Sequence, residues 1–264
     1  MNRTLVIAEI GSCHDGEPLQ AIRLINVARS CGADVAKFQF WSSADRLAER
    51  RHADAYREIY RRYQLPQASL ALLKARCDNQ GLEFMCTTYL PEDVEVVAPF
   101  VSRFKVASFE AADVALMDAH RSFDDREIIV STGMIGDGEY WALRDEWSDV
   151  SSDVSWLHCV SSYPAPVESL NLSVIIGYGM DGFSDHSSPI ETWTGALAVA
   201  AGARIIEAHL RLDDTDPQNP DAPHAMTPSQ FSEYVRNIRF AETALGHGNK
   251  CVMACEAAMT PYRV

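Results

Sequence analysis

Two histidines follow short apolar runs in the last third of the sequence and could bind one metal ion. His186 ends the run Gly182-Phe183-Ser184-Asp185-His186, and His209 ends the run Ile205-Ile206-Glu207-Ala208-His209. Both runs have the length and composition of a β-strand, and they lie about one βα unit apart. Imidazole binds Mn, Fe, Co or Zn, and a site with two protein ligands leaves positions open for water and substrate. The spacing therefore predicts a metal-assisted pocket.

Earlier apolar runs also end in polar side chains, several of which could bind an anion. Lys37 and Lys105 lie inside such runs, where lysine is rare without a function. Ammonium groups supply charge and hydroxyl groups supply directional hydrogen bonds, which suits a phosphate and a carboxylate. The polar residues at the strand ends are Glu9, Lys37, Gln39, Thr87, Thr88, Lys105, Ser108, Glu110, Ser131, Thr132, Ser161, Ser184, His186, Glu207 and His209. They predict an enzyme that acts on a small anionic substrate.

Each of these residues also has a purely structural interpretation. The two lysines could pair with nearby carboxylates, and Glu207 could be a salt-bridged acid of the core. His14, in Ser12-Cys13-His14-Asp15-Gly16, could be a ligand or could order the first loop. His158 is interpreted as a core histidine whose hydrogen bonds are satisfied.

The sequence predicts an α/β fold, a single (β/α)8 TIM barrel over residues 1–264. Short runs typical of strands alternate with helical patterns along the whole chain. Strands are predicted at 5–10, 34–40, 83–88, 103–108, 127–132, 154–161, 179–184 and 204–210. Helices are predicted near 18–31, 53–62, 66–80, 92–97, 112–119, 138–147, 190–201 and 228–244, with 162–178 irregular and 211–228 an ordered loop. In such a barrel the catalytic groups lie at the C-terminal ends of the strands. A doubly wound open sheet is the alternative, although it normally has a glycine-rich first turn that this chain lacks.

Composition limits the classes of partner. The formal net charge of −14 argues against nucleic acid or an anionic membrane as the main partner. The sequence contains no apolar run of the roughly 20 residues that span a bilayer. The start of the chain does not resemble a signal peptide, and the seven cysteines are an odd number spread along it. A cytoplasmic enzyme is therefore expected.

Several motifs occur in an order that resembles one family. They are Ala8-Glu9-Ile10-Gly11, Ala36-Lys37-Phe38-Gln39, Phe104-Lys105-Val106-Ala107-Ser108, Ser131-Thr132-Gly133-Met134, Ser162-Tyr163-Pro164-Ala165-Pro166 and Ser184-Asp185-His186. Together they resemble the catalytic barrel of the sialic acid (N-acetylneuraminate) synthases, whose members also make legionaminic and pseudaminic acids. The resemblance runs from Leu5 to about Gly248.

The resemblance implies a site for phosphoenolpyruvate and an aldehyde sugar. It implies that phosphoenolpyruvate is bound by Lys37, Thr87, Lys105, Ser108, Ser131, Ser161 and Ser184, and that the acceptor is bound by Gln39, Tyr163, Glu110 and Asp221. Glu9, His186 and His209 are the implied catalytic residues, with His186 and His209 also the implied ligands of a divalent metal. Manganese is the metal expected, with magnesium or cobalt as alternatives. A homodimer is implied by the resemblance alone.

The sequence departs from the family pattern in three places. Cys13 stands where an asparagine is usual, and Ser161 stands where an asparagine contacts phosphoenolpyruvate. The family's antifreeze-like C-terminal cap domain is also expected to be missing from residues 1–264. Two other functions therefore stay open: a metal-dependent aldolase or isomerase acting on another phosphorylated substrate, and an inactive barrel that serves as a sensor or scaffold.

Overall fold

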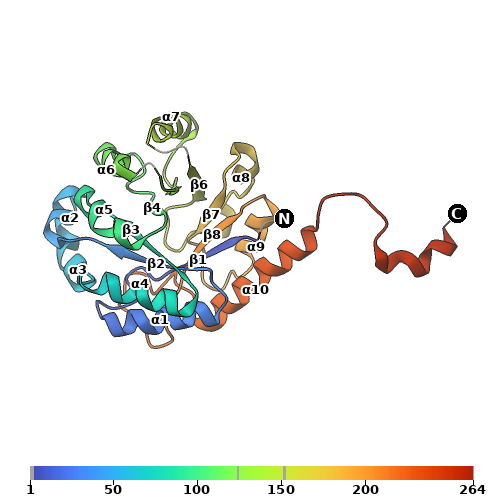
Figure 1. The fold of residues 1–264 in the computed structure, drawn as a ribbon, viewed down its shortest axis with the longest axis horizontal. Coiled ribbons are helices and arrows are strands. Elements are labelled where there is room, and N and C mark those ends of the chain that lie inside the picture. The colour runs from blue at the N-terminus through green and yellow to red at the C-terminus, as the bar shows by residue number, and fades with distance from the viewer. Residues whose placement is uncertain (1–2, 124, 151–152, 264) are drawn as a thin grey trace.

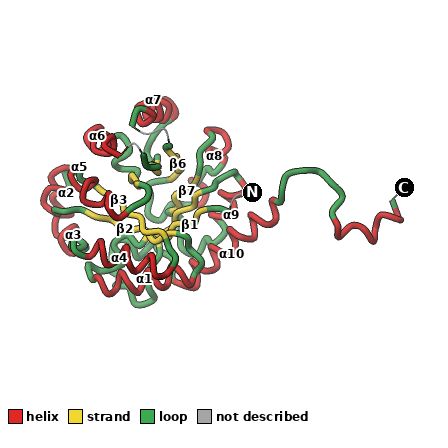
Figure 2. The backbone as a smooth tube through the Cα atoms, in the orientation of Figure 1, coloured by secondary structure: helices red, strands yellow, loops and turns green. Residues whose placement is uncertain are grey.

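Eight parallel strands close into a barrel in the computed structural model, which describes residues 3–123, 125–150 and 153–263. Each strand pairs with the next one in the sequence, and β8 returns to pair with β1, so the sheet has no free edge. Helices surround the strands (Figures 1 and 2). The strands are β1 (Leu5–Glu9), β2 (Val35–Phe40), β3 (Glu83–Thr88), β4 (Phe104–Val106), β5 (Ile128–Ser131), β6 (Val154–Cys159), β7 (Gly182–Asp185) and β8 (Ile205–His209). The predicted (β/α)8 barrel is confirmed.

The helices follow the predicted pattern with three corrections. They are α1 (Pro18–Ser30), α2 (Ala44–Arg50), α3 (Arg57–Arg62), α4 (Ser69–Gln80), α5 (Pro91–Val97), α6 (Val114–His120), α7 (Asp137–Ser148), α8 (Ser173–Tyr178), α9 (Thr194–Ala200) and α10 (Pro228–Leu245). The helix predicted over 53–62 is wrong at its start, because a 3₁₀ turn at Asp54–Tyr56 precedes α3. Neither α2 nor α8 was predicted. Both are only six or seven residues long, too short for an apolar periodicity to be visible in the sequence.

The barrel interior is built in two layers by the alternation of side chains along each strand. The lower layer is apolar and comprises Ile7, Val35, Met85, Ile129, Leu157 and Ile205. Two residues further along the same strands the interior positions become polar, as at Glu9, Lys37 and Ser131. At position 182 this layer has room only for a glycine, since a Cβ there would lie 2.1 Å from the Ile205 carbonyl oxygen. The apolar layer thus closes the bottom of the barrel, and charged groups lie above it.

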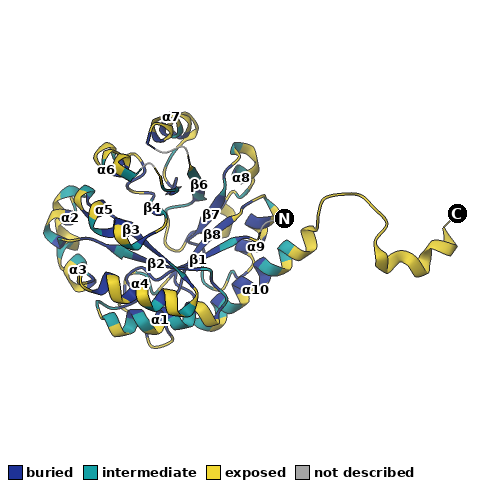
Figure 3. Ribbon diagram, viewed as in Figure 1, coloured by how far each residue is buried: buried dark blue, intermediate teal, exposed yellow. Residues whose placement is uncertain are grey.

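The segment 211–228, predicted as an ordered loop, follows β8 and folds back over the top of the barrel. A backbone bridge joins Leu210 to Met226, and the Met226 amide donates to the His209 carbonyl at 2.9 Å. A capping box between Thr227 and Gln230 then starts α10. Beyond α10 the chain runs away from the barrel and is exposed (Figure 3).

Across the described ranges, no helix combines the length and the apolar character that a membrane span requires.

Candidate active site

A cavity of about 200 Å³ lies at the C-terminal ends of the strands. Its walls come from nearly every strand and from the loops that follow them. They are formed by Glu9, Lys37, Gln39, Arg51, Tyr89, Lys105, Ala107, Ser108, Phe109, Ser131, Tyr163, Ser184, His186, Glu207, His209 and Asp221. Most of the residues predicted from the sequence therefore surround one cavity.

Two buried lysines and two buried carboxylates form the floor of this cavity. Lys37 Nζ lies 2.6 Å from Glu9 Oε2 and 3.5 Å from Glu207 Oε2. Lys105 Nζ lies 3.8 Å from Glu207 Oε1 and donates to Ser131 Oγ at 2.7 Å. All four side chains are at most 6% exposed, so water screens these charges little. The site thus holds its two ammonium groups against carboxylates that an anionic substrate could displace.

The two carboxylates differ in their readiness to hold a proton. Burial raises the pKa of Glu9 to about 7, although Lys37 opposes that rise. Burial also disfavours the charged form of Glu207, but Lys105 and Lys37 outweigh it and lower the pKa of Glu207 to about 2. Glu207 is therefore a fixed negative charge, and Glu9 can take up or release a proton near neutral pH.

Hydroxyl groups from neighbouring strands stand around the lysines. Lys37 Nζ donates to Thr87 Oγ1 at 3.1 Å, which places Thr87 beneath the cavity floor. Ser184 Oγ donates to Glu207 Oε1 at 2.8 Å. Ser108 and Ser161 hydroxyls lie 2.9 Å apart. The predicted anion-binding residues are thus adjacent, and Thr87 and Ser161 support the wall rather than lining it.

Gly133 allows the loop after β5 to pass close to these serines. A Cβ at Gly133 would lie 2.0 Å from Ser161 Oγ and 2.8 Å from Cys159 Sγ. Any side chain at position 133 of Ser131-Thr132-Gly133-Met134 would clash with these atoms, which explains why a glycine is present.

The predicted acceptor residues take different positions. Gln39 Nε2 donates to Glu9 Oε1 at 2.7 Å, and Tyr163 packs on His186 with ring centroids 4.4 Å apart. The buried Glu110 carboxylate is bound by the Arg51 guanidinium and lies outside the cavity wall. The side chain of Asp221, in the loop after β8, lines the cavity. Their contacts with an acceptor remain predictions.

Imidazole rings form one side of the cavity. The His186 and His209 ring centroids are 5.8 Å apart, and those of His209 and His224 are 4.5 Å apart. Burial lowers the pKa of His186 and of His209 to about 4, so both rings are neutral at pH 7. Neutral imidazole is the form that binds metals.

A divalent metal fits this side of the cavity. Among the described residues, His209 Nδ1 and both ring nitrogens of His224 are buried without a hydrogen-bond partner. Buried polar atoms are normally hydrogen-bonded, so unpaired imidazole nitrogens beside a carboxylate are an arrangement that a cation would complete. The donor set of nitrogen and oxygen suits Mn, Fe, Co or Zn.

Several residues of the site were assigned no specific role from the sequence. Glu207 was named among the polar strand-end residues, with a salt-bridged core acid as the alternative; its position two residues before His209 on one strand places both on the interior face. His224 and Arg51 come from loops, and no pattern in the sequence connects them to the barrel. The guanidinium of Arg51 lies over the Tyr89 ring at 4.5 Å, which fixes it at the rim.

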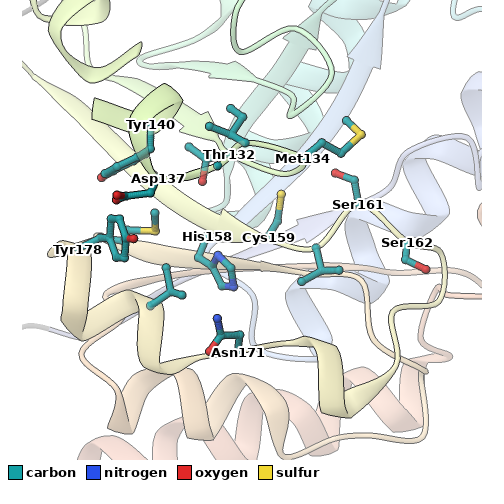
Figure 4. A pocket seen from close by; sticks show the side chains of 15 residues that line it. Thr132, Met134, Asp137, Tyr140, His158, Cys159, Ser161, Ser162, Asn171 and Tyr178 are labelled. Atoms are coloured by element: carbon teal, nitrogen blue, oxygen red, sulfur yellow. The ribbon is translucent and has the colours of Figure 1, made fainter. Parts of the chain in front are cut away.

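A larger cavity of about 540 Å³ lies outside the barrel, near β5, β6, α7 and α8 (Figure 4). Tyr140, His158, Asn171 and Tyr178 are among the residues around it. His158 is half-buried there, with its Nε2 2.8 Å from the Leu170 carbonyl oxygen, in keeping with the structural role predicted for it. The buried charges of the barrel interior are absent from its lining.

Comparison with known proteins identifies relatives along the whole barrel. The NeuB family model matches residues 24–250. Protein MJ1065 of Methanocaldococcus jannaschii is 33% identical over 260 residues, spanning 96% of this chain and 75% of that protein. The N,N'-diacetyllegionaminic acid synthase of Legionella pneumophila is 30% identical over 268 residues, spanning 93% of this chain and 74% of that enzyme.

A solved structure has the same fold at comparable identity. The N-acetylneuraminic acid synthetase of Leptospira borgpetersenii, in complex with citrate, superposes with a TM-score of 0.88 at 29% identity. The match covers 99% of this chain and 92% of that one. The predicted resemblance to the sialic acid synthases is confirmed. Because the family model spans most of the barrel, this chain belongs to the NeuB family.

Proposed function

We propose that the protein condenses phosphoenolpyruvate with an aldehyde sugar, giving a 2-keto-3-deoxy acid and inorganic phosphate. The observation that carries the proposal is the pair of buried lysines beside Glu207, within hydrogen-bond reach of Ser131 and Thr87. Buried lysines are costly unless charges compensate them, and phosphoenolpyruvate brings both a phosphate and a carboxylate. Membership of a family whose named members include legionaminic and pseudaminic acid synthases supports the same chemistry.

The two anionic groups of phosphoenolpyruvate have separate partners in this arrangement. Lys105, Ser131 and Ser108 lie on adjacent strands or the loop after them and suit one group. Lys37, whose ammonium group donates to Thr87 behind the wall, suits the other. When its two anionic groups are bound in this way, phosphoenolpyruvate holds its enol carbon between the lysines and the histidine side of the cavity, where an aldehyde could approach.

The reaction balances with phosphoenolpyruvate, the aldehyde and water as its only reactants. C3 of phosphoenolpyruvate forms a bond to the aldehyde carbon, and the aldehyde oxygen takes up a proton. Water adds at C2, the C2–O bond to phosphate breaks, and phosphate leaves with the bridging oxygen. Fixed charges and positioning supply most of the rate in such a site.

Glu9 is the proposed proton carrier. Its carboxylate is 1% exposed and is held between Lys37 and Gln39, so it cannot swing away from the cavity. With a pKa near 7 it can accept the proton of the water that adds at C2.

A divalent metal, most suitably Mn²⁺, with Mg²⁺ or Co²⁺ as alternatives, would act as a Lewis acid on the aldehyde oxygen. His186 and His209 were predicted to hold it, and both rings border the cavity. Tyr163, packed against His186, and Asp221 would then orient the acceptor beside it.

The proposal also covers the acceptor substrate, the cellular compartment and the oligomeric state of the protein. An N-acetylmannosamine-like aldehyde is the first acceptor to test. The seven cysteines are all free thiols in the described structure, which supports the cytoplasm as the compartment. A homodimer stays a prediction.

Calorimetry of phosphoenolpyruvate binding tests the proposal. The Lys105→Met variant is expected to bind at least about 100-fold more weakly than wild type, because a charge-assisted contact is lost in a buried site. The exposed Lys74, which pairs with Asp78 on α4, provides a matched control in Lys74→Met. No binding by the wild-type chain would contradict the proposal and favour another phosphorylated substrate or an inactive scaffold.

A further inference from the structure

A buried carboxylate joins the end of β7 to two helices outside the barrel. Asp185 is the last residue of β7 and is 3% exposed. Its neighbours in the sequence, Ser184 and His186, both line the active-site cavity. Because successive side chains of a strand point to opposite faces, the Asp185 side chain lies on the outer side of the strand, toward the helices. Asp185 therefore belongs to the segment that carries site residues without lining the cavity itself.

Three hydrogen bonds hold this carboxylate. The Tyr234 hydroxyl, from α10, donates to Asp185 Oδ2 at 2.8 Å, and the Thr194 hydroxyl, from α9, donates to the same oxygen. The Ser187 amide donates to Asp185 Oδ1 at 2.9 Å. A buried carboxylate is costly unless hydrogen bonds compensate it, so this side chain is held in one position relative to both helices.

The packing of α9 against α10 brings the Tyr234 hydroxyl to this point. The two helices lie side by side outside the last strands of the barrel (Figure 1). A Cβ at Gly195 of α9 would lie 2.5 Å from Tyr234 Cζ, so only a glycine lets the ring come this close. Burial and the Asp185 carboxylate hold the pKa of Tyr234 well above its ordinary value, so the hydroxyl keeps its proton and donates it. The contact is therefore a consequence of how these helices pack.

On the cavity side, the same segment is held by single hydrogen bonds. Ser184 Oγ donates to Glu207 Oε1 at 2.8 Å. His186 Nδ1 lies 2.9 Å from the Val160 carbonyl oxygen, and because a carbonyl oxygen only accepts, Nδ1 is the donor. A rotation of the end of β7 about its own axis would move the Ser184 hydroxyl and the His186 ring together. The contacts of Asp185 on the outer side oppose such a rotation.

We propose that Asp185 is a positioning residue, which fixes the Ser184 hydroxyl and the His186 ring in the active-site cavity. Tyr234 and Thr194 anchor it from the helix layer. The inference goes beyond the proposed function and rests on it only where turnover or phosphoenolpyruvate binding is measured. A displacement of about 1 Å can lower a rate about 100-fold, so kcat is expected to fall about 100-fold in Asp185→Asn and about tenfold in Tyr234→Phe, which loses one of the three hydrogen bonds.

Nuclear magnetic resonance of the histidine side chains tests the inference without any substrate. In the metal-free, ¹⁵N-labelled 264-residue chain, the Nδ1–H signal of His186 reports its hydrogen bond to Val160. The signal is assigned by its loss in His186→Gln. Tyr234→Phe and Asp185→Asn are both expected to shift it, because the ring changes its position relative to the carbonyl. A carboxylate that only stabilises the fold would leave the signal where it is in any variant that stays folded.

The chain offers a matched control for the signal and for the substitution. His158 Nε2 lies 2.8 Å from the Leu170 carbonyl oxygen on the outer side of β6, so its N–H signal should not respond to changes at the end of β7. Tyr140 is a buried tyrosine of α7 whose hydroxyl accepts from Arg144. Tyr140→Phe is therefore expected to leave the His186 signal unchanged.

A double-mutant cycle on phosphoenolpyruvate binding shows whether Asp185 acts through Ser184. Calorimetry is expected to show that Asp185→Asn weakens binding about tenfold in the wild-type background and less than about twofold in Ser184→Ala, where the hydroxyl is already missing. Tyr140→Phe should change the affinity in neither background. Every variant is measured below its unfolding temperature, as judged by circular dichroism. Tyr234→Phe, which retains the ring, takes the place of Asp185→Asn if that variant fails to fold.

Two results would overturn the inference. One is an unchanged His186 signal in folded Tyr234→Phe and Asp185→Asn; the other is equal weakening of phosphoenolpyruvate binding by Asp185→Asn with and without the Ser184 hydroxyl. The two proposals can fail separately. A shifted signal in a chain that does not bind phosphoenolpyruvate refutes the proposed function alone. Phosphoenolpyruvate binding by wild type, together with an unchanged signal in both variants, refutes the positioning role alone.

Discussion

The Glu9→Gln variant is expected to turn over about 1,000-fold more slowly than wild type while its affinity for phosphoenolpyruvate changes little. An amide retains the shape and the contact with Gln39 but cannot accept a proton at neutral pH, and a positioned general base contributes about 10²–10⁴-fold. The rate constant kcat from phosphate release and the dissociation constant from calorimetry measure the two effects separately.

The pH dependence gives a second readout for Glu9. A base with a pKa of about 7 is charged above that pH, so wild-type kcat is expected to rise as the pH passes through 7. The Glu9→Gln variant should lack this rise. Glu95→Gln on the exposed face of α5 is the matched control. A wild-type kcat in Glu9→Gln would exclude Glu9 as the proton carrier.

The Glu207→Gln variant is expected to lose about 3–5 kcal/mol of the free energy of unfolding in the absence of ligand. The substitution leaves Lys105 and Lys37 buried with less compensating charge, and breaking a buried ion pair by removing one partner has a cost of about this size. Denaturant unfolding of the ligand-free variant measures the loss.

Phosphoenolpyruvate should restore more stability to Glu207→Gln than to wild type. The ligand supplies negative charge where the carboxylate has been removed, and a ligand that binds the folded state stabilises it. The thermal midpoint with and without ligand tests this, again beside Glu95→Gln. An unchanged stability of ligand-free Glu207→Gln would show that the lysines do not depend on this carboxylate.

Much of the barrel and its charged layer could be predicted because successive side chains of a strand point to opposite faces, with a period of two residues. Once Val35-Ala36-Lys37 is assigned to a strand, Lys37 shares a face with the core residue Val35 and must end above it. The same reasoning applies to Lys105, Ser131 and His209. In such barrels the C-terminal ends of all the strands lie at one face, so these residues come together there.

The residues that escaped prediction come from loops or from unexpected partners. His224 reaches the site only because the loop after β8 bends back through the Leu210–Met226 bridge, a contact with no local sequence signal. Arg51 follows α2, a helix too short to be visible as a pattern. The family resemblance assigned Glu110 to the acceptor, whereas in the structure its partner is Arg51, which lies 59 residues earlier in the chain.

The central claim is that carbon–oxygen cleavage of phosphoenolpyruvate accompanies carbon–carbon bond formation. The direct measurement is to incubate the chain with phosphoenolpyruvate, Mn²⁺ and an aldehyde such as N-acetylmannosamine in ¹⁸O-labelled water, and to analyse phosphate and product by mass spectrometry. The account predicts aldehyde-dependent phosphate release, one 2-keto-3-deoxy acid per phosphate, and no ¹⁸O in the phosphate. Phosphate that carries ¹⁸O would mean hydrolysis at phosphorus, and phosphate released equally without an aldehyde would mean cleavage uncoupled from carbon–carbon bond formation; either result would contradict it.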